Sequence, residues 1–200
     1  MKKTLKATAV IVLCCVLMIV IVIYTPEPLE ERRQRSEKVL AHLDKKELAH
    51  IKLTHTALRK AIKAIEAINE AHELIHEEKA DLKPLIEANL EAIDALTKAG
   101  AAVKSGTDEM QRLNQEWIDL NPMIKANSKL VASLTEVIER MEALTEELQR
   151  FTKEKAHPWP PHEVIFGAVR KAVDAIELAQ NANSKAIDAF NQYLEARRQL

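Results

Sequence analysis

The apolar and polar positions divide the chain into zones of different period. The first zone is an uncharged run of eighteen residues, 7–24, which follows Lys2, Lys3 and Lys6. As a helix this run spans about 27 Å, just long enough to cross the hydrocarbon core of a bilayer. It is longer than the apolar core of most signal peptides, and it ends without a small-x-small cleavage site. It therefore predicts an uncleaved transmembrane signal anchor.

The charges beside this run predict its orientation. The tail 1–6 carries three lysines and the α-amino group, and such a tail is hard to translocate. We expect the tail to be cytoplasmic and residues 25–200 to lie outside, in the periplasm of a bacterial inner membrane. Cys14 and Cys15 lie inside the apolar run and no cysteine follows them, so the outer domain contains no disulfide.

The second zone is charged. Residues 25–38 include the stretch PEPLEERRQRSEK, which is too charged for either a core or lipid and predicts a solvated stalk. From Val39 the apolar residues recur at helical steps of three and four positions: Leu40, Leu43, Leu48, Ile51, Leu58, Ile62, Ile65 and Ile68. Pro84 bounds this first long helix and predicts a turn near 80–84.

The third zone has a heptad spacing typical of packed helices. One line contains Leu96, Val103, Met110, Trp117, Ile124, Val131 and Ile138, and a second contains Ala92, Ala99, Gly106, Leu113, Leu120, Leu134 and Met141. Two places favour a break. A turn at 105–107 would use Gly106 as a cap, and a turn at 120–122 would use Asn121 and Pro122 as N-cap and first turn.

The segment HPWPPH, residues 157–162, predicts a firm stop because its three prolines cannot continue a helix. A last helix follows, and its seam contains Ile165, Val169, Ala172, Ile176, Ala179, Ala186, Phe190 and Tyr193.

These elements predict an all-α domain over 39–200. If each proline segment is a turn, four helices of roughly 35 to 40 residues form an antiparallel four-helix up-down bundle. If Pro122 only kinks the chain, the alternative is an extended coiled-coil hairpin that must oligomerise to bury its seam. The composition agrees with long helices, since the chain has 3 Gly and an aromatic content of 4%.

The charge balance excludes one class of partner. The formal net charge is −1, with 29 basic and 30 acidic residues interspersed along the chain. No basic face of the kind that nucleic acids require is present. The expected partners are therefore the bilayer, another protein or a second copy of the chain.

Two four-residue segments each occur twice in the predicted helices. ANSK occurs at 126–129 and 182–185, and AIDA occurs at 92–95 and 186–189. Similar bundle helices drawn from few residue types converge readily, so we interpret these words as convergence. Asn127 and Asn183 fall on apolar lines, where a buried amide fixes register at a cost in stability. The alternative is that they flank turns or face water.

The stretch His72-Glu73-Leu74-Ile75-His76 matches H-E-x-x-H, in which two histidines on one helical face bind Zn²⁺ and the glutamate activates a water. His72 and His76 are thus the candidate metal ligands. In a hairpin that turns near Pro84, Glu87 or Glu91 is the candidate third ligand.

Other observations oppose a zinc hydrolase. No third histidine follows in the extended motif, residue 79 is Lys where that motif has Gly, and the chain offers no strand. A second motif, E-x-x-H, occurs at Glu47–His50 and at Glu73–His76. The two copies lie about 39 Å apart on one predicted helix and cannot share a di-iron site. We expect His72 and His76 to be boundary residues, with no catalytic residue and no cofactor other than zinc.

The sequence thus favours a non-enzymatic, single-pass membrane protein that acts as a scaffold, assembly or partner-docking subunit through its helical bundle. The first alternative is a periplasmic ligand-sensing four-helix module that works with another subunit. The second alternative is a zinc-dependent hydrolase that uses His72, Glu73 and His76.

Overall fold

The computed structural model describes residues 29–76, 81–113, 119–153 and 161–199, and these are helical almost throughout. The helices are α2 (Leu29–Glu70), α3 (His72–His76), α4 (Lys83–Leu113), α5 (Asn121–Lys153) and α6 (Pro161–Arg198). No strand occurs in these ranges. The predicted all-α class is confirmed.

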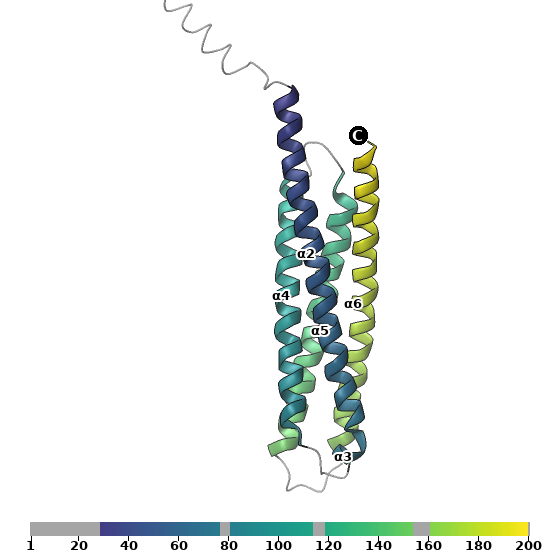
Figure 1. The fold of residues 1–200 in the computed structure, drawn as a ribbon. Coiled ribbons are helices and arrows are strands. Elements are labelled where there is room, and N and C mark those ends of the chain that lie inside the picture. The colour runs from purple at the N-terminus through teal and green to yellow at the C-terminus, as the bar shows by residue number, and fades with distance from the viewer. Residues whose placement is uncertain (1–28, 77–80, 114–118, 154–160, 200) are drawn as a thin grey trace, which may run out of the picture. The chain divides into compact units, whose positions relative to one another are not determined.

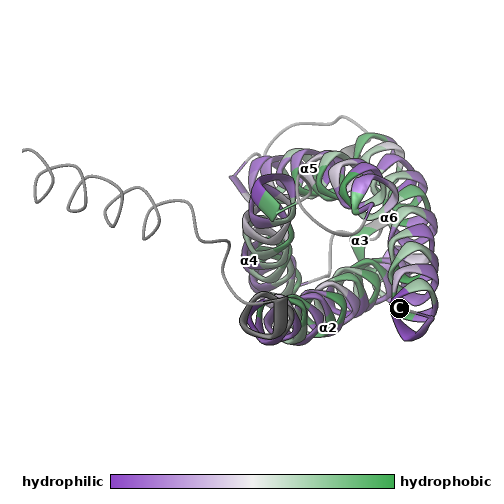
Figure 2. Ribbon diagram, turned by 90° about the horizontal axis from the view of Figure 1, so that it is seen from above, coloured by the Kyte–Doolittle hydropathy of each residue, from purple (hydrophilic) through white to green (hydrophobic). Residues whose placement is uncertain are grey.

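The chain divides into two units, Met1–His42 and Leu43–Leu200. In the second unit, α2, α4, α5 and α6 run alternately in opposite directions around a common core (Figures 1 and 2). Helix α5 packs along both α4 and α6. This is the four-helix up-down bundle, and the extended hairpin is not adopted.

The first unit contributes the start of α2. This helix begins at Leu29, ten residues before the predicted start at Val39. Gln34, Arg35, Glu37 and Lys38 are exposed, as expected for the charged stretch. Long charged side chains lose little rotamer freedom in a helix, so the helix extends through this stretch without an apolar seam.

The predicted anchor, 7–24, lies outside the described residues. Within the described ranges, no helix is both long and apolar enough to cross a membrane.

Helices α4 and α5 begin in the same way. The Lys83 amide donates to Asp81 Oδ1 at 3.1 Å, and the Asn121 amide donates to Asp119 Oδ1 at 3.0 Å. In each case a proline, Pro84 or Pro122, occupies the second helical residue, where its missing N–H is not needed. An aspartate therefore caps each helix, and Asn121 is already inside α5 instead of serving as its N-cap.

The alternative break at 105–107 does not occur, because α4 continues through Gly106 to Leu113. Since the chain reverses between α4 and α5, the two helices have independent phases. The first residues of the predicted line are buried, whereas Ile124, Val131 and Ile138 are only partly buried, and Val131 and Ile138 pack against the edge of the core. The buried seam of α5 comprises Met123, Asn127, Leu130, Leu134, Val137, Met141, Leu144, Thr145 and Leu148.

Alanines line much of the core on α2, α4 and α6. They allow close approach to the larger side chains of α5. The fully or nearly fully buried alanines of the core are Ala57, Ala61, Ala64, Ala92, Ala99, Ala172, Ala175, Ala179 and Ala186.

Candidate functional site

Buried polar residues are concentrated in one half of the bundle. We define the polar half as residues 43–56, 99–113, 120–134 and 182–199, which cross-helix contacts place at one level. The apolar half comprises 57–75, 82–98, 135–153 and 163–181. The buried polar residues of the polar half are Glu47, His50, Thr54, Thr107, Asn127 and Asn183. Those of the apolar half, within the described ranges, are Asn89 and Thr145.

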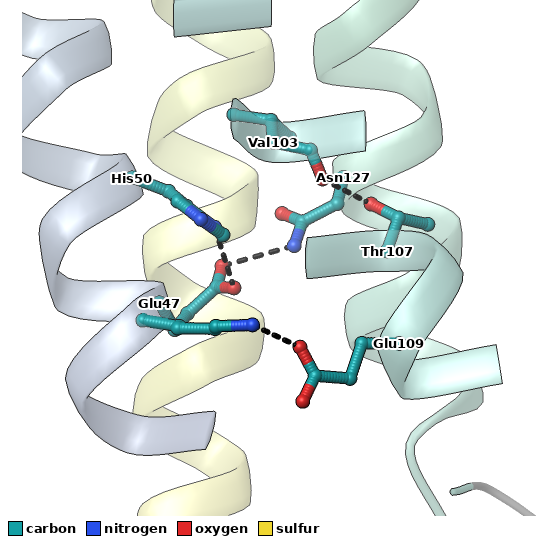
Figure 3. A network of polar contacts seen from close by, with 7 residues as sticks. Glu47, His50, Val103, Thr107, Glu109 and Asn127 are labelled. Carbon is teal, nitrogen blue, oxygen red and sulfur yellow. Dashed lines mark hydrogen bonds and ion pairs between the residues drawn. The ribbon is translucent and has the colours of Figure 1, made fainter. Parts of the chain in front are cut away.

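Glu47 lies at the centre of the polar half and is 2% exposed. Asn127 Nδ2 of α5 donates to Glu47 Oε1 at 2.9 Å, and His50 Nδ1 lies 3.7 Å from Glu47 Oε2 (Figure 3). The carboxylate is therefore held by one amide and stands beside one imidazole. A buried carboxylate needs more donors than this to offset its lost hydration.

His50 lies directly against α4 at Gly106. A Cβ atom added to Gly106 would stand 2.2 Å from His50 Cε1 and 2.7 Å from His50 Nδ1. Glycine within a helix costs about 1 kcal/mol relative to alanine. At position 106 the glycine has this cost, but its missing side chain leaves room for the His50 imidazole in the core.

Several buried atoms in the polar half have no hydrogen-bond partner among the described residues. They are Asp44 Oδ1, Glu47 Oε2, His50 Nδ1, Thr54 Oγ1, Asn183 Oδ1 and Tyr193 Oη. Each buried polar atom without a partner costs about 1–3 kcal/mol. These unpartnered atoms therefore offset part of the stability that the polar half gains from burial.

Ion pairs flank this layer. Lys46 of α2 pairs with Glu109 of α4, and Arg197 of α6 pairs with Asp44 of α2. Tyr193 of α6 is buried near Asp44, and its pKa is raised to about 12 by this burial and, secondarily, by the negative charge of Asp44. The tyrosine therefore keeps its proton across the physiological range.

Among the described residues of the apolar half, one buried polar contact joins two helices, and its donors are all used, although Asn89 Oδ1 has no partner. Asn89 Nδ2 of α4 donates to the Met141 carbonyl at 2.8 Å and to Thr145 Oγ1 at 2.6 Å. Thr145 Oγ1 itself donates to the Met141 carbonyl at 2.8 Å. This three-membered contact joins α4 to α5 directly.

Sequence reasoning missed the relation between α4 and α5. Residues 81–113 align without a gap to 119–151, and twelve of these 33 positions are identical. The identical residues of the first copy are Asp81, Leu82, Pro84, Ile86, Ala88, Asn89, Leu96, Thr97, Thr107, Glu109, Gln111 and Arg112. Asn89 and Asn127 are therefore equivalent, and so are Thr107 and Thr145. We interpret the two helices as copies of one unit.

The words ANSK and AIDA belong to the same pattern. The segment ANSKAIDAF at 182–190 combines both, and it resembles ANLEAIDAL at 88–96 and ANSKLVASL at 126–134. The asparagines of the three segments, Asn89, Asn127 and Asn183, are all buried. The interpretation of Asn127 and Asn183 as buried members of the seams is confirmed. The twelve identities occur at a different spacing from the ANSK and AIDA pairs, and convergence of those pairs stays a prediction.

The predicted zinc ligands lie in and near α3, at the far end of the apolar half. The exposed His72 ring lies 4.3 Å from the Phe166 ring of α6, and Glu73 is exposed. The side chain of His76 lies outside the described residues, so the ligand geometry of the pair stays a prediction. In this arrangement the His72 ring packs at a tilt against an aromatic ring.

The two candidate third ligands face other partners. Glu87 stands 4.0 Å from Lys83 Nζ and Glu91 stands 3.9 Å from Lys60 Nζ, and both carboxylates are exposed. Within the described part of the chain, no group of three or more His, Cys, Asp or Glu side chains is arranged to hold a metal ion.

Comparisons with protein-family models, with curated proteins and with solved structures found no match for this chain. The polar half is therefore the candidate functional site on its own geometry. It offers a buried carboxylate and imidazole side by side, together with buried side-chain amides.

Proposed function

We propose that this chain is a non-enzymatic, membrane-anchored docking subunit whose helical bundle lies outside the inner membrane. The observation that carries the proposal is that the bundle is closed within one chain. The apolar seams of α4, α5 and α6 are buried against one another. A partner must therefore contact the outer surface of the bundle, and seam exchange between copies is not needed for stability.

Single leucines on the outer surface supply anchor points for such a partner. On the long helices α2, α4 and α6, those that are roughly half exposed are Leu48, Leu53, Leu90 and Leu178. Leu178, at 55%, is the most exposed of them. An apolar side chain among charged neighbours is a suitable centre for a small contact, because a few buried anchors supply most of the binding energy.

Photo-crosslinking of the full chain in its native membrane tests the proposal. A photoreactive residue at Leu178 or Leu48 is expected to give one discrete product of higher mass that persists on sizing in mild detergent. The same residue at the buried Leu144 is the matched control and should give only internal products. A strict monomer with no product from any of the four leucines would contradict docking.

The orientation is tested separately. Ser128 is exposed on α5, and a Ser128→Cys variant introduces a thiol outside the predicted anchor. We expect a membrane-impermeant thiol reagent to label this variant in cells whose outer membrane alone has been permeabilised. Labelling only after lysis would place the bundle in the cytoplasm instead.

The second candidate function is a ligand-sensing module that signals through another subunit. The unpartnered buried atoms of Glu47, His50, Thr54 and Asn183 favour it, because a polar ligand would satisfy them. A thermal-shift screen with small polar metabolites tests this candidate. A flat response across the screen would remove it.

A further inference from the structure

Asn127 faces two alternative sets of partners. From Asn89 to Thr107 along α4, and from Thr145 back to Asn127 along α5, the distance is eighteen residues in each case. Eighteen residues are about five helical turns, so each step returns to the same face of its helix. Since α4 and α5 are antiparallel, Asn127 faces Thr107 in the way that Asn89 faces Thr145.

The partners on α4 are ready to accept this amide. Thr107 Oγ1 donates to the Val103 carbonyl at 2.8 Å, which reproduces the Thr145–Met141 bond of the other copy. Asn89 adds its donors to that arrangement without disturbing it. Asn127 does not donate to the Thr107–Val103 pair, because its amide points to Glu47 of α2 and away from Thr107 (Figure 3).

The first part of α2 in the bundle is held weakly. Residues 43–54 bury one apolar side chain, Leu43, and three polar ones, Glu47, His50 and Thr54, and each of the three polar side chains has an atom without a partner. The flanking ion pairs of Lys46 and Asp44 contribute little, as is usual for pairs near the surface. The next part of α2 is held by apolar side chains instead: Ala57, Leu58, Ala61, Ala64, Ile65 and Ile68.

We propose that residues 43–54 of α2 form a strap that undocks while the rest of the bundle stays folded, and that Asn127 changes partner when it does. In the docked state Asn127 donates to Glu47. In the undocked state it donates to the Val103 carbonyl and Thr107 Oγ1, while water solvates Glu47 and His50. Undocking thus leaves the Asn127 Nδ2 donors satisfied and uncovers the inner faces of α4 and α6. The inference stands apart from the docking proposal, because it concerns the isolated chain.

Amide hydrogen exchange of the full chain in mild detergent tests the strap. After correction for intrinsic rates, we expect amides of 43–54 to exchange at least about tenfold faster than those of 57–68, through openings that depend weakly on denaturant. A single common rate for both segments would show that α2 opens only with the whole bundle, and would overturn the proposal.

Two matched pairs of variants test the change of partner. Thr107→Val removes an acceptor that Asn127 uses only in the undocked state, so strap exchange should slow by about fivefold. Thr145→Val, at the equivalent position, removes an acceptor used in the native state, and should instead speed exchange in the apolar half.

In the second pair, Glu47→Leu should slow strap exchange by about tenfold or more, since an apolar side chain docks without an unpaired charge. Glu66→Leu, on the exposed face of the same helix, should leave it unchanged. An unchanged or faster exchange rate of the strap amides in Thr107→Val would overturn the partner change. The exchange rates of the unsubstituted chain test the strap itself even if a variant fails to fold.

Discussion

Asn89 and Asn127 occupy the same position in two copies of one helix, yet they make different contacts. Asn89 joins α4 to α5 through Thr145 and the Met141 carbonyl. Asn127 has the equivalent Thr107 in front of it and donates to Glu47 of α2 instead. The difference shows that α2, which is not part of the repeat, determines the chemistry of the polar half.

A second difference between the copies has the same origin. Where α5 places the fully buried Leu144, α4 places Gly106, and His50 of α2 occupies the space. The repeat by itself would build the same leucine and asparagine pattern at both ends of the bundle. Glu47 and His50 replace it at one end with a polar layer that is less completely hydrogen-bonded.

The largest expected effect on stability comes from placing at position 106 of α4 the leucine that α5 has at the equivalent position 144. Gly106→Leu should destabilise the protein by about 3 kcal/mol, because even its Cβ collides with the His50 ring. Denaturant unfolding of the full chain measures this loss. Adding His50→Ala should restore most of the stability.

Gly100→Ala is the matched control, since an added Cβ at Gly100 meets nothing within 4 Å. We expect this substitution to stabilise the protein by about 1 kcal/mol through helix propensity. Equal effects of alanine at positions 100 and 106 would show that His50 does not require the glycine.

The next largest effect distinguishes the two asparagines. Asn127→Ala should cost about 2 kcal/mol, because it leaves the buried Glu47 carboxylate without its donor. Asn89→Ala should cost about 1 kcal/mol, since Thr145 and the Met141 carbonyl still bond to each other. In a Glu47→Leu background the cost of Asn127→Ala should fall to that of Asn89→Ala. Independent, additive effects of Glu47 and Asn127 would contradict the coupling.

A smaller effect of opposite sign is expected at Thr54. Its hydroxyl is fully buried without a partner among the described residues, so Thr54→Val should stabilise the protein by about 1 kcal/mol. Thr97→Val, at an exposed position of α4, is the control and should change the stability by less than about 0.5 kcal/mol. A loss of stability in Thr54→Val would mean that its hydroxyl has a partner.

The smallest effect is a pH dependence at Tyr193. Its pKa is raised from 10.0 to about 12 in the folded protein. The folded state therefore holds this proton more tightly than the unfolded chain, and the stability falls as the pH rises from about 10 towards 12. Unfolding midpoints across this range should fall more steeply for the unsubstituted protein than for Tyr193→Phe. Parallel curves would show that this hydroxyl contributes no pH dependence.

The sequence predicted the features that local chemistry determines. Prolines 84 and 122 stand in the first turns of α4 and α5, and the helical spacing identified the all-α class. The heptad line failed beyond Met110 because a reversal of the chain resets the phase, and spacing alone does not show where a reversal lies. The charged stretch 29–38 was interpreted as a stalk, although its residues are good helix formers.

The polar half was harder to predict, for two reasons. A search for identical words finds ANSK and AIDA but overlooks a repeat whose twelve identities are spread over 33 positions. In addition, the Glu47–His50 spacing matches the E-x-x-H metal motif. The contacts that these two side chains make depend on which helices pack against them. Only the assembled bundle brings Asn127 and Gly106 to these two side chains.

The position of the Asn127 amide in a Glu47→Leu variant, determined by crystallography, tests most directly whether α2 alone sets the two copies apart. We expect Asn127 Nδ2 to lie within hydrogen-bond distance of the Val103 carbonyl and Thr107 Oγ1, as Asn89 does with Met141 and Thr145. An Asn127 amide that still points toward α2 and makes no hydrogen bond to Thr107 would contradict the claim that α2 alone sets the two copies apart.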